Sequence, residues 1–250
     1  ATIGIVSPAS PMRDEKKLHN GIRYLESLGY RVELAPHVGN TDAYLAGSDA
    51  DRAADIENMF CNPSIDAIFC SRGGYGAMRF LSRLNYRRIS AHPKIFVGFS
   101  DITALNCALH RRSRLCTFSG AMVGVDMGAF DGESEEQFWG MLTSKRKPRS
   151  LVQSLEVQTV REGDARGHLV CGNLSILAAL AGTPYAPNYK NAVILVEDIG
   201  EESYKVDRLL CQLELSKNLS QSSALLFGQF SGEHLRNSST AQRPMIEVLR

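Results

Sequence analysis

The sequence lacks several features that mark whole classes of protein. No apolar run approaches the roughly 18 residues that a membrane-spanning helix needs. The N-terminal stretch ATIGIVSPAS has no charged segment of the kind that opens a signal peptide. There is also no internal repeat and no low-complexity tract. We therefore expect a cytoplasmic protein with no membrane partner.

An excess of charge is missing too. The formal net charge is +1 at pH 7, although 22% of the residues are charged. A protein with so small a net charge is not strongly attracted to nucleic acid or anionic lipid, so we expect no nucleic-acid partner. The one short basic run, residues 145–147, stands beside Pro148 and is interpreted as part of a solvated linker.

Paired cysteine motifs are absent as well. None of the six cysteines belongs to a C-x-x-C pair, and Cys70, Cys107 and Cys211 lie inside apolar runs. This pattern predicts buried free thiols in a reducing compartment and argues against a disulfide framework or a zinc site. No metal site is expected.

What the sequence does contain is an alternation of strands and helices. Strands are predicted at residues 2–6, 31–35, 66–70, 95–99 and 115–119, and helices at 14–28, 51–60, 76–84 and 101–110. Alternation of this kind predicts an α/β fold with a parallel sheet and helices on its faces. Residues 1–130 are therefore interpreted as an N-terminal domain with a parallel sheet.

The regular alternation of predicted strands and helices ends after residue 130. Residues 131–150 are polar and contain proline, which indicates a linker, although Phe138, Trp139, Met141 and Leu142 could form a short docking helix. Later elements are short strands within 151–171, a helix at 173–181, a strand at 192–197, a helix at 203–215 and a strand at 224–230. Residues 151–250 are thus predicted to form a smaller, mixed α/β C-terminal domain.

Ser100 stands at the corner where an apolar strand stops and a helix begins, in GFSDIT. A serine there can cap the helix, because its oxygen accepts a hydrogen bond from an unpaired backbone N–H. Alternatively it is a nucleophile on a sharp strand-to-helix turn at the carboxyl edge of the sheet. Gly98 lies two residues earlier, as such a turn requires, but Ile102 occupies the place of the second glycine.

A glycine-rich segment, SRGGYG at residues 71–76, also follows a strand and precedes a helix. Its glycines let the backbone approach a ligand and leave N–H groups free to donate. It matches neither G-x-G-x-x-G nor a phosphate-binding G-K-[ST] ending, so a nucleotide site is a poor fit. It is either an oxyanion donor or a plain tight turn, and it shares the sheet edge with Ser100.

A run of acids, VEDIGEE, follows the buried strand predicted at 192–197. Acids in this position lie at a strand's carboxyl end, where α/β proteins form their sites. Solvated loop acids and a cap for the next helix are the alternative.

Four segments in this order resemble the LD-carboxypeptidase family of serine peptidases, which includes muramoyltetrapeptide carboxypeptidases and microcin-immunity proteins. They are SRGGYG, GFSDIT, GNLSILAALAGTP and VEDIGEESYKVDRLLCQL. The resemblance covers about residues 3–235 and implies a Rossmann-like N-terminal domain, a smaller C-terminal domain, and an active site between them.

The resemblance also implies roles for individual residues. Ser100 matches the nucleophile and Glu197 matches the acid of a Ser-His-Glu triad. Backbone N–H groups of Asp101 and Gly74 match the donors that stabilise the oxyanion. A nucleophile, an orienting carboxylate and preformed donors together form the machinery of acyl transfer.

The implied activity is release of the terminal D-alanine from murein tetrapeptide, a small peptide, through an acyl-enzyme during peptidoglycan recycling. No cofactor or metal is implied, and a homodimer is expected. Gly73, Tyr75 and Asn173 are expected to bind substrate.

The triad histidine of the family lies in a glycine-histidine motif beyond the strand that matches 224–230. None of the six histidines here, at 19, 37, 92, 110, 168 and 234, has that context, and His234 is the nearest along the chain. We therefore expect the base to lie outside this chain and the chain alone to be nearly inactive. Two alternatives stay open: a microcin-immunity-type hydrolase of peptidyl-adenylates, and a non-catalytic, truncated binding module.

Overall fold

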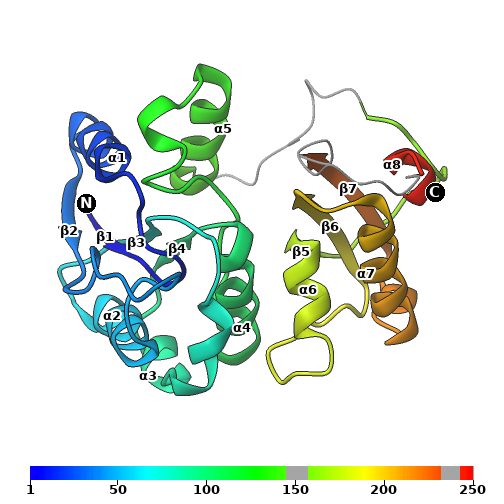
Figure 1. Ribbon diagram of the computed structural model, residues 1–250, viewed down its shortest axis with the longest axis horizontal. Coiled ribbons are helices and arrows are strands. Elements are labelled where there is room, and N and C mark those ends of the chain that lie inside the picture. Colours follow the sequence, from blue (N-terminus) through cyan, green and yellow to red (C-terminus); the bar gives the residue numbers. More distant parts are fainter. Residues whose placement is uncertain (145–156, 232–242, 250) are drawn as a thin grey trace.

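A computed structural model describes residues 1–144, 157–231 and 243–249, and within them it contains two parallel sheets (Figure 1). The first sheet has the order β2-β1-β3-β4, with β1 Thr2–Val6, β2 Arg31–Leu34, β3 Ala67–Cys70 and β4 Ile95–Val97. The second has the order β5-β6-β7, with β5 His168–Asn173, β6 Ala192–Ile199 and β7 Ala224–Ser231. The predicted α/β class is therefore confirmed.

The first sheet is built around β1, whose five residues are all buried. Ile3 of β1 is in register with Val32 of β2 and with Ala67 of β3, both in parallel. Helices α1 Glu15–Ser27, α2 Asp49–Cys61, α3 Tyr86–Ala91 and α4 Thr103–Ser113 surround this sheet. A strand covered by helices must be apolar on both faces, which explains the unbroken apolar run TIGIV.

Helix α1 shows how local sequence fixes an element. Asp14 caps its start by accepting a hydrogen bond from the backbone N–H of Lys16 at 3.0 Å. Gly29, with a φ of +85°, follows its end. Within the helix, a Cβ on Gly21 would lie 1.9 Å from the carbonyl oxygen of Val123. Glycine at this position lets α1 pack directly against the loop after residue 118.

Three local predictions were wrong. The helix predicted at 76–84 is a 3₁₀ helix, η1 Ala77–Arg83, and no side chain caps its start. The strand predicted at 115–119 is reduced to a single bridge between Phe118 and Val97. Of the strands predicted within 151–171, only β5 forms in the described part, and residues 151–156 lie outside it.

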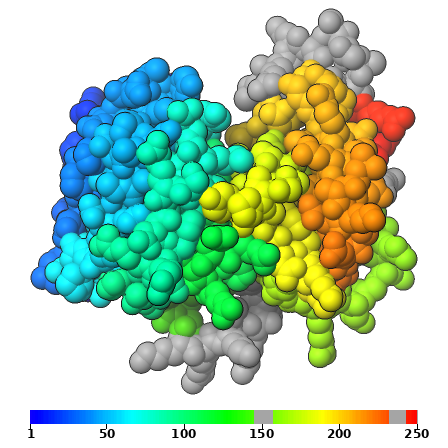
Figure 2. Space-filling view, turned by 90° about the horizontal axis from the view of Figure 1, so that it is seen from below, coloured from blue at the N-terminus to red at the C-terminus, as the bar shows by residue number. Residues whose placement is uncertain are grey.

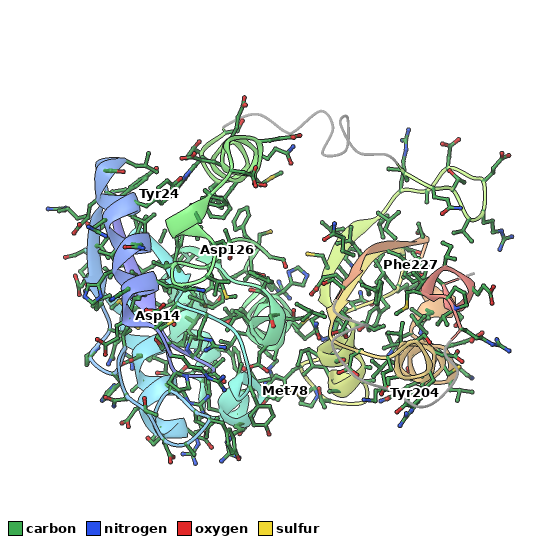
Figure 3. The ribbon with its side chains drawn as sticks, turned by 45° about the horizontal axis from the view of Figure 1, so that its top comes forward. Asp14, Tyr24, Met78, Asp126, Tyr204 and Phe227 are labelled. Carbon is green, nitrogen blue, oxygen red and sulfur yellow. The ribbon has the colours of Figure 1, made fainter. Side chains whose placement is uncertain are left out.

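The predicted linker contains a docked helix, α5 Gly132–Thr143. The indole Nε1 of Trp139 donates to the Tyr24 hydroxyl at 2.7 Å, and that hydroxyl donates to Glu135 at 2.5 Å. The Trp139 ring also stacks on Tyr30 with centroids 5.1 Å apart. Burial raises the pKa of Tyr24 to about 12, with the Glu135 carboxylate adding to the effect. Figure 3 shows Tyr24 on α1, close to α5.

The two sheets belong to two lobes that meet at α4. We call residues 1–144 the first lobe and the described residues after 156 the second lobe (Figure 2). A Cβ on Gly172 of β5 would lie 2.3 Å from Cγ2 of Thr103, the first residue of α4. The Thr103 hydroxyl also accepts from the backbone N–H of Asn173 at 3.1 Å. The predicted domain limits, 1–130, 131–150 and 151–250, remain a prediction.

In the second lobe, buried residues of the central strand β6 alternate with half-buried ones up to the exposed Ile199 at its end. Helices α6 Leu174–Leu180, α7 Ser203–Leu215 and α8 Met245–Val248 complete this lobe. Among the described residues, no helix is long and apolar enough to cross a membrane. The same residues contain no group of three His, Cys, Asp or Glu side chains arranged to hold a metal ion.

All six cysteines are free thiols. Cys70 and Cys107 are buried as predicted, and burial raises the pKa of the Cys107 thiol to about 12. Cys211 is exposed, so its predicted burial was wrong. The reason is helical geometry: α7 buries Val206 and Leu213 and turns Cys211 away from that face.

His37 gives the first lobe a pH-dependent contact. Its Nδ1 lies 2.8 Å from the buried Asp55 carboxylate, and this hydrogen bond raises the pKa of His37 above its ordinary value. A raised histidine pKa stabilises the fold below the unfolded pKa of about 6.5, and that stability is lost as pH rises through the folded pKa. We expect His37→Gln to lower the free energy of unfolding more at about pH 5.5 than at about pH 8.5. Urea unfolding at both values checks this, with the exposed His19→Gln as control.

Candidate active site

Ser100 occupies a strained corner after β4. Its φ is +62°, in the left-handed region that side chains other than glycine rarely adopt, at a cost of roughly 1–2 kcal/mol. It opens the 3₁₀ helix η2 Ser100–Ile102, which leads directly into α4, and no side chain caps either helix. The Ser100 hydroxyl makes no hydrogen bond within the described part of the chain. The geometry is that of a sharp strand-to-helix turn rather than of a helix cap.

The lack of a side chain at Gly98 allows the sharp turn at Ser100. A Cβ there would lie 2.8 Å from Cγ2 of Ile102 and 3.1 Å from Cβ of Cys70. The Gly98 carbonyl also accepts from the amide of Asn106 on α4 at 2.8 Å. The side chain of Ile102 is fully buried against Gly98, which explains how the turn forms without a glycine at position 102.

The turn formed by residues 71–76 lies against Ser100. A Cβ on Gly73 would lie 2.9 Å from the Ser100 Cβ and 3.1 Å from its Oγ. Gly74 has a φ of +113°, and a Cβ there would meet Oγ of Ser10 at 2.4 Å. The two predicted pieces of the sheet edge are therefore brought together, and glycine is required at both contacts.

Buried charged side chains hold this turn in place. The Asp101 carboxylate, 4% exposed, accepts from the backbone N–H of Ala77 at 2.8 Å, and burial raises its pKa. Arg52, 1% exposed, donates to the carbonyls of Gly76 at 2.9 Å and Pro8 at 2.8 Å. The turn is thus tied to both the Ser100 corner and α2.

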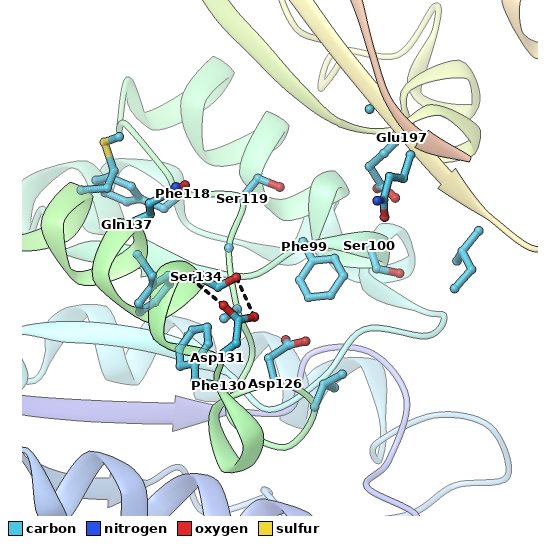
Figure 4. A pocket seen from close by; sticks show the side chains of 18 of the residues that line it. Phe99, Ser100, Phe118, Ser119, Asp126, Phe130, Asp131, Ser134, Gln137 and Glu197 are labelled. Carbon is cyan, nitrogen blue, oxygen red and sulfur yellow. Dashed lines mark hydrogen bonds between the residues drawn. The ribbon is translucent and has the colours of Figure 1, made fainter. Parts of the chain in front are cut away.

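A cleft of about 930 Å³ opens beside Ser100 and runs between the lobes (Figure 4). The first lobe supplies Phe99, Ser100 and residues from the loop 118–131 and from α5, and the second lobe supplies residues of β6 and β7. Glu197 of β6 lies in the wall of the second lobe. Ser100 and Glu197 therefore line one cleft from opposite lobes.

Glu197 and Asp198 differ sharply although they are neighbours. Burial raises the pKa of Glu197, with the Asp198 charge adding to it and Asn173 opposing it. The Asp198 carboxylate is 5% exposed and accepts from the Asn173 amide at 2.9 Å and from the Ser175 hydroxyl at 2.7 Å. Asp198 thus ties β6 to α6, whereas Glu197 faces the cleft.

Asn173 and Tyr75 do not line the cleft. The Asn173 side chain caps α6 through the N–H of Ile176 and donates to Asp198, so both of its polar atoms are engaged inside the second lobe. Tyr75 is 53% exposed, and its ring packs against Tyr44. Their substrate-binding roles, like that of Gly73, remain predictions.

No histidine lines the cleft among the described residues. The rings of His110 and His168 donate to the backbone carbonyls of Leu115 and Asn188, at 3.1 Å and 2.8 Å. His234 lies outside the described residues.

Sequence reasoning missed the cleft wall formed by the loop 118–131 and α5. Its members include Phe118, Asp126, Phe130, Gln137 and Phe138. No motif marks them, because their place in the wall depends on how α5 docks against α1. The apolar positions of α5 were the one available signal.

The raised pKa of Glu197 predicts a gain in stability when its charge is removed. A carboxyl group whose folded pKa exceeds the unfolded value destabilises the fold once pH rises through both values. Glu197→Gln should therefore increase the free energy of unfolding at pH 7, and the gain should vanish below about pH 4, where Glu197 is protonated. Urea titrations at both pH values test this. The exposed Glu136→Gln should show no such gain, and a loss of stability at pH 7 in Glu197→Gln would contradict the prediction.

Comparison with known proteins identifies the chain. The LD-carboxypeptidase N-terminal domain matches residues 3–120, and the LD-carboxypeptidase C-terminal domain matches residues 166–250. A probable murein peptide carboxypeptidase of Bacillus subtilis is 37% identical over 238 residues, covering 92% of this chain and 72% of that protein. This chain belongs to the LD-carboxypeptidase family. The resemblance inferred from its motifs is confirmed.

Other relatives of this LD-carboxypeptidase chain include murein tetrapeptide carboxypeptidases and a microcin immunity protein. The murein tetrapeptide carboxypeptidase of Pseudomonas aeruginosa is 32% identical over 237 residues, covering 92% of this chain and 76% of that protein. The crystal structure of a muramoyltetrapeptide carboxypeptidase from Oxalobacter formigenes has a TM-score of 0.84 at 30% identity, covering all of this chain and 83% of that one. A structure of the microcin immunity protein MccF with glutamyl sulfamoyl guanosine has a TM-score of 0.86 at 25% identity, covering 99% and 82%.

Proposed function

We propose that this protein is a serine LD-carboxypeptidase that releases the terminal D-alanine of murein tetrapeptide. The observation that carries the proposal is the strained Ser100 in the cleft lining, with the glycine turn against it and Glu197 on the wall of the other lobe. The names of the relatives support the substrate. The family resemblance further implies a homodimer that acts in the cytoplasm during peptidoglycan recycling, and both belong to the proposal.

In the proposed mechanism, Ser100 Oγ attacks the carbonyl carbon of the bond between the L-centre of the diamino acid and D-alanine. The negative charge on the carbonyl oxygen is stabilised by the N–H groups of Asp101 and Gly74, and each such donor is worth about 10²–10³ in kcat. Collapse of this intermediate expels the amine of D-alanine, which takes up a proton, and leaves an acyl-enzyme on Ser100. Water then hydrolyses the ester and restores the hydroxyl.

A histidine carries the proton in this proposal, and Glu197 orients its ring. By family resemblance this histidine belongs to a glycine-histidine motif that matches none of the six histidines in the chain. The raised pKa of Glu197 fits a carboxylate that is held in a partly dehydrated site until it pairs with an imidazolium.

Hydrolysis of a peptidyl-adenylate analogue is the second candidate. The fold matches MccF in complex with a nucleoside ligand, and the aromatic residues Phe118, Phe130 and Phe138 line the cleft. The higher identity to the murein peptide carboxypeptidases, 37% against 26% for the microcin C7 self-immunity protein of Escherichia coli, favours the tetrapeptide.

The deciding experiment compares the two substrates directly. The complete product of the gene and the 250-residue chain are each incubated with murein tetrapeptide and with an aminoacyl sulfamoyl adenosine, and products are quantified by mass spectrometry. Release of D-alanine by the complete product alone is the expected result. Cleavage of the sulfamoyl compound without D-alanine release would favour the second candidate, and binding of tetrapeptide without turnover would favour a binding module.

A further inference from the structure

The charged side chains that line the cleft are all negative in the part of the chain that the structure describes. Three charged side chains line it in the described residues, Asp126, Asp131 and Glu197, and all are carboxylates. None of the lining residues that the structure describes is Lys, Arg or His. A cleft with this lining favours a ligand group of positive charge.

The three carboxylates are engaged differently. Asp131 caps α5, because its Oδ1 accepts from the backbone N–H of Ser134 at 2.8 Å and its Oδ2 accepts from the Ser134 hydroxyl at 2.9 Å (Figure 4). These bonds lower the pKa of Asp131, so its negative charge is already satisfied. Glu197 is assigned to the proposed triad.

Asp126 is the carboxylate with an oxygen still available to accept a hydrogen bond. Its Oδ2 accepts from the backbone N–H of Met122 at 2.8 Å, whereas its Oδ1 has no hydrogen-bond partner among the described residues. The residue is half-buried, and burial raises its pKa. A carboxylate that is partly removed from water and has no cation beside it gains free energy when a ligand ammonium pairs with it.

The loop that carries Asp126 is fixed to the proposed catalytic machinery. The N–H of Val123 donates to the carbonyl of Cys70 at 3.1 Å, and the N–H of Gly124 donates to the carbonyl of Ser71 at 2.8 Å. Ser71 begins the turn that touches Ser100, and Asp126 follows Gly124 by two residues. Figure 4 shows Asp126 on the first-lobe side of the cleft that Ser100 also lines.

Apolar side chains flank Asp126 within the cleft. Phe99, Val125 and Phe130 line the same space, and Val125 is 47% exposed. Methylene groups of a long side chain would cover this surface while a charged end reaches the carboxylate. A lysine-like side chain has both parts.

We propose that Asp126 is a specificity-determining residue that binds the side-chain ammonium of the substrate residue on the amino side of the cut bond. The inference rests on the proposed function and adds which substrates the site prefers. A charge-assisted hydrogen bond to an ammonium corresponds to about 10- to 100-fold in kcat/KM. The site should therefore discriminate against a substrate of the same shape without the charge.

The test uses two tetrapeptides that end in D-alanine and differ only in the third residue, L-lysine or Nε-acetyl-L-lysine. D-Alanine release by the complete gene product is measured as kcat/KM for both. We expect the wild type to prefer the lysine peptide by about tenfold or more, and Asp126→Asn to bring the ratio near unity. Asparagine keeps an oxygen for the Met122 N–H, and urea unfolding verifies that the variant folds.

Asp131→Asn is the matched control. It removes the other first-lobe carboxylate of the cleft, and asparagine is itself a good helix cap, so the preference ratio should stay as in the wild type. Equal rates for the two peptides in the wild type would overturn the inference but leave the proposed function standing, as would a preference that survives in Asp126→Asn. No D-alanine release from either peptide would overturn the proposed function and the inference together.

Discussion

Replacing Ser100 with alanine should lower kcat for D-alanine release by about 10⁴-fold or more in the complete gene product. The change removes the atom that forms the acyl-enzyme while the proposed N–H donors of Asp101 and Gly74 stay in place. These donors can still polarise the carbonyl for attack by water, so a small residual rate above the uncatalysed one is expected. Quenched-time-point assays of free D-alanine measure both rates.

The same substitution should leave the fold intact. Alanine retains the Cβ at the +62° corner, so the strain at residue 100 persists and the free energy of unfolding should change by less than about 0.5 kcal/mol. Ser64→Ala is the control, because it also removes a serine hydroxyl, but an exposed one at a residue that does not line the cleft. Undiminished turnover in Ser100→Ala would remove Ser100 from the mechanism.

Replacing Arg52 with methionine should destabilise the protein by about 3–5 kcal/mol, because it removes one partner of a buried ion pair. The guanidinium is 1% exposed, lies 5.0 Å above the ring of Phe80, and donates to the carbonyls of Gly76 and Pro8 and to Asp49. Methionine fills much of the volume but leaves the two carbonyls without their donor and the Asp49 charge with fewer partners.

Urea unfolding with Arg79→Met as control tests this expectation. Arg79 pairs with the same Asp49 carboxylate at 3.0 Å, but its side chain is 44% exposed, so its loss should destabilise the protein far less than the loss of Arg52. Arg52→Met should also slow D-alanine release, because the Gly76 carbonyl that anchors the glycine turn becomes free. Similar losses of stability in the two variants would contradict the assigned role of Arg52.

The sequence predicted the regular elements that depend on periodicity. The helix expected at 203–215 forms with those bounds, and the strand expected at 2–6 forms and is wholly buried. Both carry their signal in neighbouring residues: a helical spacing of leucines in the first, an unbroken apolar run in the second. The corner at Ser100 was also accessible, because strand, serine and helix follow one another along the chain.

What the sequence could not predict depends on contacts between distant segments. Gly76, with a φ of +123°, and the packing of Leu45 and Arg52 against it accompany a 3₁₀ helix where an α-helix was expected. The hydrogen bond of the Asn173 amide to Asp198 joins residues 25 positions apart, and the substrate-binding role of Asn173 remains a prediction. Asp126 carries no motif, and its place in the cleft follows from backbone hydrogen bonds of its loop to the end of β3.

The docking of α5 gives the protein an optical property of its own. Trp139 is the only tryptophan in the chain, and it lies on the helix that forms one wall of the cleft. Its indole is stacked on Tyr30, packed near Phe69 and Phe138, and hydrogen-bonded to Tyr24. Light on the long-wavelength side of the tyrosine absorption band excites only the tryptophan, so the fluorescence emission spectrum comes from a single site. Without any label, the wavelength and the quenching of the Trp139 emission therefore report whether α5 is docked against the first lobe.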